Sequence, residues 1–201
     1  MSASNIINKQ IETIPVGRPF TTANFKQYTT GTNLRQILSR LARSGAVERI
    51  THDIYAKPEI YRGYKVILTG SSLTECVEQS SGEVVITYGA TAINQIGITT
   101  QSPMNEIYYY TGKNTVIKVN NQEIKLVHIN RKYANKSNHT LELILSAAYY
   151  LGKENFTLET LYKIETKLTR KALFGLYKYL PVMPTWISDL FFEYYKESGI
   201  K

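Results

Sequence analysis

The sequence is poor in the residues and patterns that mark several classes of protein. It holds a single cysteine, Cys76, in 201 residues, which excludes an internal disulfide framework and a zinc site built on clustered cysteines. No run of about 18 apolar residues occurs. The first residues, MSASNIINKQIETI, lack the basic stretch and the unbroken apolar stretch of an export signal. These absences predict a cytoplasmic protein that does not span a membrane.

Signatures of catalysis are also missing. The three histidines have no metal-ligand spacing with one another or with Cys76, and the run TYGATAINQIGITTQSP lacks the spacing of a phosphate-binding loop. In that run we expect Gly89 and Gly97 to bound a tightly packed helix. Three scattered acids, Glu75, Glu78 and Glu83, are the best enzymatic feature, and it is a weak one. The sequence predicts no catalytic residues, no metal and no cofactor.

What the sequence does have is apolar material for a core and an excess of positive charge. Hydrophobic residues make up 43% of the chain, and the formal net charge is +8. Residues 1–60 carry eight Lys and Arg against four Asp and Glu, whereas residues 140–201 carry eight against seven. A basic surface attracts polyanions, although part of such a charge can serve solubility alone. The N-terminal part is therefore the first place to look for a polyanionic partner.

Residues 1–60 read as three helices followed by a hairpin. Ser4 is the expected cap of a helix that stops before Pro15, Thr22 caps a short helix, and Thr32 caps a third. In the third helix the apolar residues Leu34, Ile37, Leu38 and Leu41 form one stripe, and Gly45 is placed to end it in the αL conformation. The runs AVERI and DIYAKP then form a hairpin around THD. This order predicts a winged helix-turn-helix domain.

Residues 61–201 mix strands and helices. SLTECVEQS and GATAINQIG are expected helices, and EVVITY, EIYYYTG, NTVIKV and QEIKLVHI are expected strands, the last two joined by a tight turn at Asn120 and Asn121. From Thr140, the expected cap of the next helix, the pattern is helical. The prediction is an α+β protein: a winged helix-turn-helix domain over 1–60, then an α/β and helical domain over 61–201. The boundary is expected near 58–64, with a weaker division near 136–139.

The polar face of the third predicted helix has the composition of a DNA-reading surface. Arg35, Gln36, Ser39, Arg40 and Arg43 lie on it without an acid among them, and arginine and amide groups are suited to base edges. The expected phosphate contacts are Thr32 and Asn33 at the helix start and Arg49 and Lys57 in the wing. The alternative is the solvated face of an ordinary amphipathic helix, because Arg and Gln are good helix formers.

Two further segments have alternative interpretations. The stretch HINRKYANKSNH combines Arg131, Lys132 and Lys136 with Tyr133, which suits either a second nucleic-acid contact or a solvated basic loop. Five aromatic residues near the C-terminus indicate the core of a terminal helix, or a partner surface if several are exposed together. These are Trp186, Phe191, Phe192, Tyr194 and Tyr195.

Two motifs resemble one known family. The run PFTTANF followed by NLRQILSRLARSGAVERITHDIYAKP, and the downstream run YGATAINQIGITTQSPMNEIYYYTG, are similar to segments of the AbiEi antitoxins of bacterial type IV toxin–antitoxin systems. The resemblance covers about Ile11 to Tyr133, with a fainter match at MPTWISDL. One position departs from the pattern: this chain has HDIY where the relatives usually carry glycine before the aromatic residue of the wing.

The resemblance implies a function. AbiEi antitoxins are winged-helix repressors that bind inverted repeats in their own operon and counteract a nucleotidyltransferase-like toxin without a stable complex. On this basis we expect a DNA-binding autorepressor and antitoxin whose partner is double-stranded DNA, bound as a dimer or as two monomers on adjacent half-sites. Two alternatives remain, a winged-helix module that binds protein and an enzyme located in the C-terminal domain.

Overall fold

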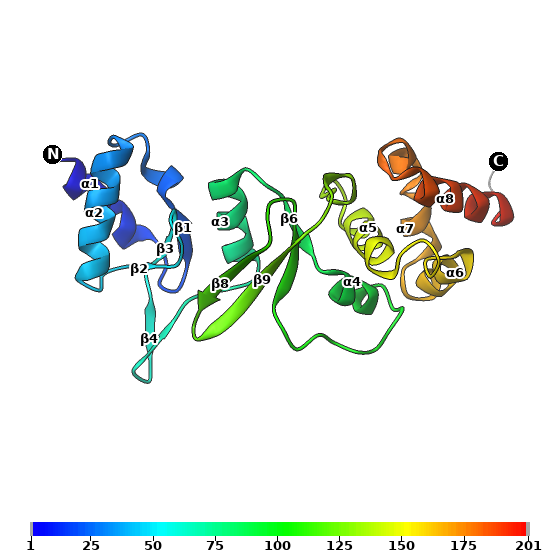
Figure 1. Ribbon diagram of the computed structural model, residues 1–201, viewed down its shortest axis with the longest axis horizontal. Helices are drawn as coiled ribbons and strands as arrows, with labels where there is room; N and C mark the ends of the chain where they lie inside the picture. Colours follow the sequence, from blue (N-terminus) through cyan, green and yellow to red (C-terminus); the bar gives the residue numbers. More distant parts are fainter. Residues whose placement is uncertain (1, 200–201) are drawn as a thin grey trace. The chain divides into compact units, whose positions relative to one another are not determined.

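The computed structural model describes residues 2–199, and its fold is α+β with a helical C-terminal part, as predicted (Figure 1). The contacts divide the chain into two compact units. The first holds the chain up to Glu83 together with Val116–Ile124, and the second holds Val84–Thr115 and the chain from Lys125 onward. The first unit therefore extends well past the predicted boundary near 58–64. Within residues 2–199, no helix is long and apolar enough to cross a membrane.

The first unit begins with helix α1, Ala3–Thr13. Its N-cap is Ser2 rather than the predicted Ser4, since the Ser2 hydroxyl accepts a hydrogen bond from the backbone N–H of Asn5 at 3.3 Å. As predicted, the helix stops before Pro15. Strand β1, Pro19–Thr21, follows and was not predicted. It lies at the edge of its sheet, where a proline is tolerated because no partner strand needs its missing N–H.

The predicted second helix is a single 3₁₀ turn, η1, Thr22–Phe25. Its cap is Thr21, not Thr22: the Asn24 side chain accepts hydrogen bonds from both the backbone N–H and the hydroxyl of Thr21, at 2.9 and 3.1 Å. The third helix, α2, spans Gly31–Arg43, and its N-cap is Thr30 rather than Thr32, because the backbone is extended at Thr30 and already helical at Thr32.

A hairpin follows α2. As predicted, Gly45 adopts a positive φ of 78° just beyond the helix. Strands β2, Glu48–Arg49, and β3, Ile54–Ala56, pair antiparallel, and β1 joins the other edge of β3 to give the order β1-β3-β2. The core beneath α1, η1, α2 and this sheet consists of Ile7, Ile11, Phe20, Phe25, Leu34, Ile37, Leu38, Val47 and Tyr55.

The rest of the first unit was predicted only in part. Strands β4, Glu59–Tyr61, and β5, Tyr64–Val66, form a short hairpin that the sequence did not reveal, with a tight turn at Arg62 and Gly63, both at positive φ. Helix α3, Ser71–Ser81, matches the prediction and packs against β1. Asn120 also belongs to this unit, because its side chain bonds both the N–H and the carbonyl of Ile67. These contacts explain why the unit extends beyond residue 60.

One sheet has the order β6-β7-β9-β8. Its strands are β6, Val85–Thr87, β7, Ile107–Tyr110, β8, Thr115–Val119, and β9, Gln122–His128. β7 pairs antiparallel with β6 and parallel with β9. The turn between β8 and β9 has Asn120 and Asn121 at positive φ, as predicted. Helix α4, Gly89–Gln95, follows β6.

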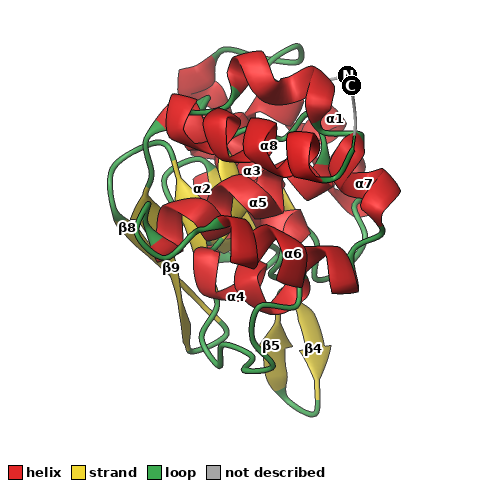
Figure 2. Ribbon diagram, turned by 90° about the vertical axis from the view of Figure 1, so that its right-hand side faces the viewer, coloured by secondary structure: helices red, strands yellow, loops and turns green. Residues whose placement is uncertain are grey.

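The C-terminal part is helical (Figure 2). After the 3₁₀ turn η2, Arg131–Tyr133, come α5, His139–Leu151, α6, Leu158–Lys167, α7, Arg170–Phe174, the 3₁₀ turn η3, Tyr177–Val182, and α8, Thr185–Glu197. The N-cap of α5 is Asn138, whose side chain accepts from the N–H of Leu141, and not the predicted Thr140.

The packing of α4 against α5 explains the glycine at position 89. A Cβ built on Gly89 would lie 2.2 Å from Cβ of Tyr150, so the two backbones approach more closely than any side chain allows. On the inner side of α4, Ala92 and the following Ile96 are fully buried, whereas Ala90 and Ile93 are only half-buried. The prediction that this glycine-bounded helix is tightly packed is confirmed at Gly89.

Candidate nucleic-acid interface

Helix α2 has one buried and one exposed face. Leu34, Ile37 and Leu38 are at most 2% exposed, whereas the opposite face is open to solvent. Six residues line one shallow hollow on the open face: Thr32, Arg35, Gln36, Ser39, Arg40 and Arg43. All five of the predicted base-contact residues are among them. No acid lines this hollow, so its three guanidinium groups leave it positively charged.

The arginines of this face differ in how firmly they are held. Nε of Arg35 donates to the carbonyl of Gly31 at 3.2 Å, and a terminal nitrogen of Arg43 donates to Oγ of Ser39 at 3.4 Å. These bonds orient the two side chains along the helix. The side chain of Arg40 forms no hydrogen bond or ion pair with any other residue in the described part of the chain. Its five N–H groups are available to an external acceptor.

The N-terminus of α2 is suited to an anion. Thr30 makes no capping hydrogen bond through its side chain, and no acid lies in the first turn, so the free N–H groups of this turn have no side-chain acceptor. Thr32 is exposed in that turn and lines the hollow. Asn33 is half-buried and donates from Nδ2 to the hydroxyl of Thr29 at 2.8 Å. Of the two predicted contacts at this helix end, only Thr32 faces the hollow.

The turn between β2 and β3, which is the predicted wing and is called the wing turn below, is held by side chains rather than by a glycine. None of the residues Thr51, His52 and Asp53 has a positive φ. Arg49 donates from its guanidinium to the carbonyls of Thr51, at 3.1 Å, and His52, at 3.4 Å. These bonds stabilise the turn in a conformation that needs no glycine. They also mean that Arg49, predicted to contact phosphate, already uses part of its guanidinium to shape the wing.

Asp53 connects the wing to η1. Its carboxylate accepts from the hydroxyl of Thr22 at 3.2 Å and lies 3.1 Å from Nδ1 of His52, and its carbonyl accepts from the N–H of Thr22. Partial burial acts to raise the pKa of Asp53, but the hydrogen bond and charge of His52, the Thr22 hydroxyl and the charge of Arg35 together lower it below its usual value. Asp53 is therefore ionised at neutral pH.

A second hollow of about 240 Å³ adjoins the first and shares Arg35 with it. Lys26, His52 and Asp53 are among the residues that line it. Sequence reasoning missed Lys26, because nothing in its local pattern shows that the segment after η1 turns towards the start of α2. With Lys26 and Arg35, the hollow places two cations beside the N-terminus of α2.

Lys57 lies elsewhere. Its ammonium donates to the carbonyl of Glu12 at 3.3 Å, at the C-terminal end of α1, where a cation is favoured by the helix dipole. It lines neither hollow. The structure thus brings together the six residues of the α2 hollow and leaves Asn33, Arg49 and Lys57 engaged in bonds of their own.

A family model described as a family of unknown function, DUF6088, matches residues 6–174. The chain belongs to DUF6088. No curated protein and no solved structure matches it. The matched range contains every residue of both hollows, and it includes parts of both compact units of this DUF6088 protein.

The other features weighed in the sequence are dispersed in this DUF6088 protein. His52 contacts Asp53, His128 lies 2.9 Å from the Gly112 carbonyl, and His139 lies 3.9 Å from Glu142. Among residues 2–199, no three His, Cys, Asp or Glu side chains are grouped so that they could hold a metal ion.

The basic segment after β9 and the C-terminal aromatics are now placed. Tyr133 is 9% exposed, and its ring packs 4.9 Å from that of Tyr149, so it is not free to stack on a base. Of the five C-terminal aromatics, Phe191, Tyr194 and Tyr195 are buried, Trp186 is half-buried and Phe192 is 53% exposed. These aromatics therefore belong mainly to the core of the second unit.

Proposed function

We propose that this protein binds double-stranded DNA and represses transcription, with α2 as the recognition helix. The observation that carries the proposal is the exposed face of α2, where three arginines, a glutamine, a serine and a threonine share one hollow without an acid. Such a face supplies cations for phosphates and forked or amide groups for base edges. The second hollow also contains the ionised Asp53, but its cations Lys26 and Arg35 and the free N–H groups of the first turn can hold a backbone phosphate.

The arrangement of the first unit supports this assignment. The chain order α1, β1, η1, α2, β2, β3, with the sheet order β1-β3-β2, agrees with a winged helix-turn-helix in which η1 replaces the second helix. The wing turn, held to η1 through Asp53, shares the second hollow with the N-terminal part of α2. Helix and wing can then approach one duplex together.

The biological role rests on the resemblance to the AbiEi antitoxins. On that basis the DNA is the protein's own operator, and the protein is a cytoplasmic antitoxin that counteracts a nucleotidyltransferase-like toxin without forming a stable complex with it. A toxin gene of that type immediately downstream supports this role. Co-expression tests it directly: the protein is expected to restore growth to cells that express the neighbouring gene. An unrelieved growth defect rejects the antitoxin role and leaves the DNA-binding proposal standing.

DNA binding is tested by titrating the purified protein against its promoter duplex and a scrambled duplex at one salt concentration. Arg40→Ala and Arg43→Ala are each expected to weaken promoter binding by about 1–3 kcal/mol and to reduce discrimination between the duplexes. Lys163→Ala is the matched control, since it removes one exposed positive charge from α6 in the second unit. Affinity unchanged in both arginine variants rejects α2 as the recognition helix.

One observation favours the second candidate, a protein-binding module. On the β4–β5 hairpin Ile60, Tyr61 and Tyr64 are 64, 58 and 76% exposed, and contiguous exposed apolar side chains commonly mark a protein contact. This candidate predicts no salt-dependent affinity for DNA, because no phosphates would be neutralised. A steep salt dependence in the titration therefore supports the DNA-binding proposal over this candidate.

A further inference from the structure

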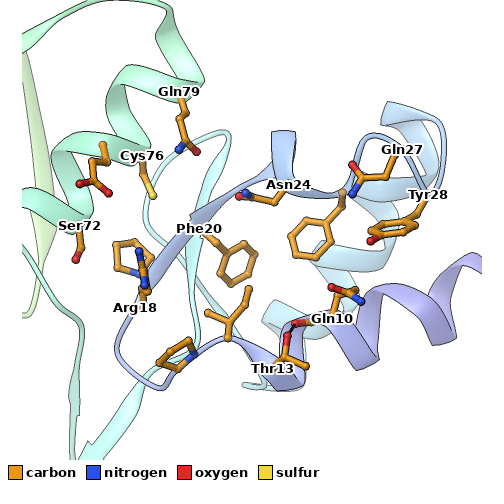
Figure 3. A pocket seen from close by; sticks show the side chains of 15 residues that line it. Gln10, Thr13, Arg18, Phe20, Asn24, Gln27, Tyr28, Ser72, Cys76 and Gln79 are labelled. Atoms are coloured by element: carbon orange, nitrogen blue, oxygen red, sulfur yellow. Dashed lines mark hydrogen bonds between the residues drawn. The ribbon is translucent and has the colours of Figure 1, made fainter.

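The first unit contains a cavity of about 400 Å³ that the proposed DNA contacts do not use (Figure 3). It lies over β1, with the C-terminal part of α1 and the η1 segment on one side and α3 on the other. Its volume lies within the range of small-molecule sites in proteins. Fifteen residues line it: Gln10, Thr13, Ile14, Pro15, Arg18, Pro19, Phe20, Asn24, Phe25, Gln27, Tyr28, Ser72, Glu75, Cys76 and Gln79.

The cavity has an apolar floor and a polar rim. Phe20, Phe25 and Cys76 are only 5, 2 and 6% exposed, and Figure 3 shows Phe20 between the α1 side and the α3 side. The rim is exposed and consists mainly of hydrogen-bonding side chains. The accessible lining is therefore mainly polar, with an apolar base, and this composition suits a polar small molecule rather than an apolar one.

Two groups on the rim carry opposite charges and have no partner. Within residues 2–199, neither Arg18 nor Glu75 forms a hydrogen bond through its side chain or an ion pair. Both are close enough to act on the Cys76 thiol: burial is the main cause that raises its pKa, the charge of Glu75 raises it further and the charge of Arg18 lowers it. The cavity therefore presents a free cation and a free anion to the same small volume.

Four amide side chains complete the rim, and only two of them have bonds within the protein. Asn24 accepts from Thr21, and Oε1 of Gln79 lies 3.4 Å from the Thr21 hydroxyl. The side chains of Gln10 and Gln27 form no hydrogen bond within the described residues. Each of these two amides can donate and accept at once, which suits a ligand that itself carries an amide or peptide group.

We propose that this cavity binds a small zwitterion of the amino-acid class, with its carboxylate on Arg18, its ammonium on Glu75 and its polar side chain among the rim amides. A guanidinium pairs well with a carboxylate because it offers two parallel N–H donors. A free amino acid and a dipeptide share the two charged ends, so both belong to this class. The inference goes beyond the proposed function and does not depend on DNA binding.

Calorimetric titration of the full-length protein with L-glutamine and with the dipeptide alanyl-glutamine tests the proposal. The two titrations also show whether the cavity binds a free amino acid or a dipeptide. At least one probe is expected to bind saturably, and N-acetyl-glutamine methylamide, which lacks both charges, is expected not to bind. Arg18→Ala and Glu75→Gln should each weaken binding at least about tenfold, the loss that follows from removing one hydrogen-bonded charge. Arg62→Ala, at an exposed arginine on the β4–β5 hairpin, is the matched control and should bind normally.

Cys76 provides a second measurement that needs no variant. It is the one cysteine of the chain and lines the cavity, so a bound probe should slow its alkylation at alkaline pH. This measurement keeps the test valid if Arg18→Ala fails to fold. Absence of saturable binding by both probes overturns the proposal. Binding that is unaffected by Arg18→Ala and Glu75→Gln, or that leaves the alkylation rate unchanged, also overturns it.

Discussion

Replacing Gly89 with alanine is expected to loosen the second unit, by an amount that follows from its contacts. The added Cβ would lie 2.2 Å from Cβ and 2.6 Å from Cγ of Tyr150, far inside the contact distance of about 3.5–4 Å between carbon atoms. Because Cβ is at the root of the Tyr150 side chain, a rotamer change cannot relieve the clash. Helices α4 and α5 must separate instead, which also disturbs the edge-to-face contact between Tyr88 and Tyr150.

Overpacking of this kind costs about 1–3 kcal/mol, and the higher helix propensity of alanine returns at most about 1 kcal/mol. A contact of 2.2 Å places this site at the upper end of the overpacking range, about 2–3 kcal/mol, so we expect a net loss of about 1–3 kcal/mol in the free energy of unfolding. Urea unfolding followed by fluorescence of Trp186 measures it, since this is the only tryptophan and it belongs to the second unit.

Gly31→Ala is the matched control for this prediction. Gly31 also begins a helix, but a Cβ there meets no atom within 4 Å, and its φ is not positive. This variant should be as stable as the wild type or up to about 1 kcal/mol more stable, as measured by far-ultraviolet circular dichroism. An unfolding midpoint of Gly89→Ala equal to that of the wild type would refute the reasoning.

Three further predictions concern a cation, a thiol and two tyrosines. Lys26→Ala should weaken binding to the promoter duplex and to the scrambled duplex equally, and it should reduce the slope of log affinity against log salt concentration by about one phosphate contact. A loss of affinity for the promoter alone contradicts this. Burial raises the pKa of Cys76 to about 11, so alkylation near pH 8 should be about a hundredfold slower than that of free cysteine, and equal rates contradict it. Burial, with neighbouring tyrosines, raises the pKa of Tyr109 and Tyr195. The stability that these two buried, protonated side chains contribute is therefore complete below about pH 10, their pKa in the unfolded chain, and is lost as the pH rises through their pKa values in the folded protein. A urea unfolding midpoint, followed by Trp186 fluorescence, that does not fall over this pH range contradicts the prediction.

Much of the fold follows from local sequence. The apolar stripe through Leu34, Ile37 and Leu38 predicted the buried face of α2, and Gly45 predicted where that helix ends. Asn120 and Asn121 predicted the turn between β8 and β9. In each case a few neighbouring residues are enough for the prediction, since helical periodicity and positive φ are properties of short segments.

The helix starts were predicted less well. Ser2, Thr30 and Asn138 are the observed caps, where Ser4, Thr32 and Thr140 were expected. At each of these starts more than one capping residue lies within a turn, and propensity does not choose between them. The choice depends on where the preceding chain leaves the extended conformation, which is set by packing against the rest of the unit.

Strand β1 and the division into units needed the tertiary structure. β1 is three residues long and contains a proline, so its strand character comes from pairing with β3, more than thirty residues later. Residues 116–124 join the first unit partly through Asn120, whose side chain bonds Ile67 across 53 positions. Neither the β1–β3 pairing nor the bonds between Asn120 and Ile67 can be predicted from local composition, because both join segments that are far apart in the sequence.

For the candidate interface, helical periodicity was enough to predict the residues that line the hollow on the exposed face of α2, because a helix of known phase places them on one side. The tertiary structure decided which of the other predicted contacts remain available: Arg49 is engaged in the wing, Lys57 lies at the end of α1, and Lys26 is brought beside the helix start. The reason is geometric. Helical periodicity orders side chains within one element, but only the packing of several elements brings charges from different elements to one surface.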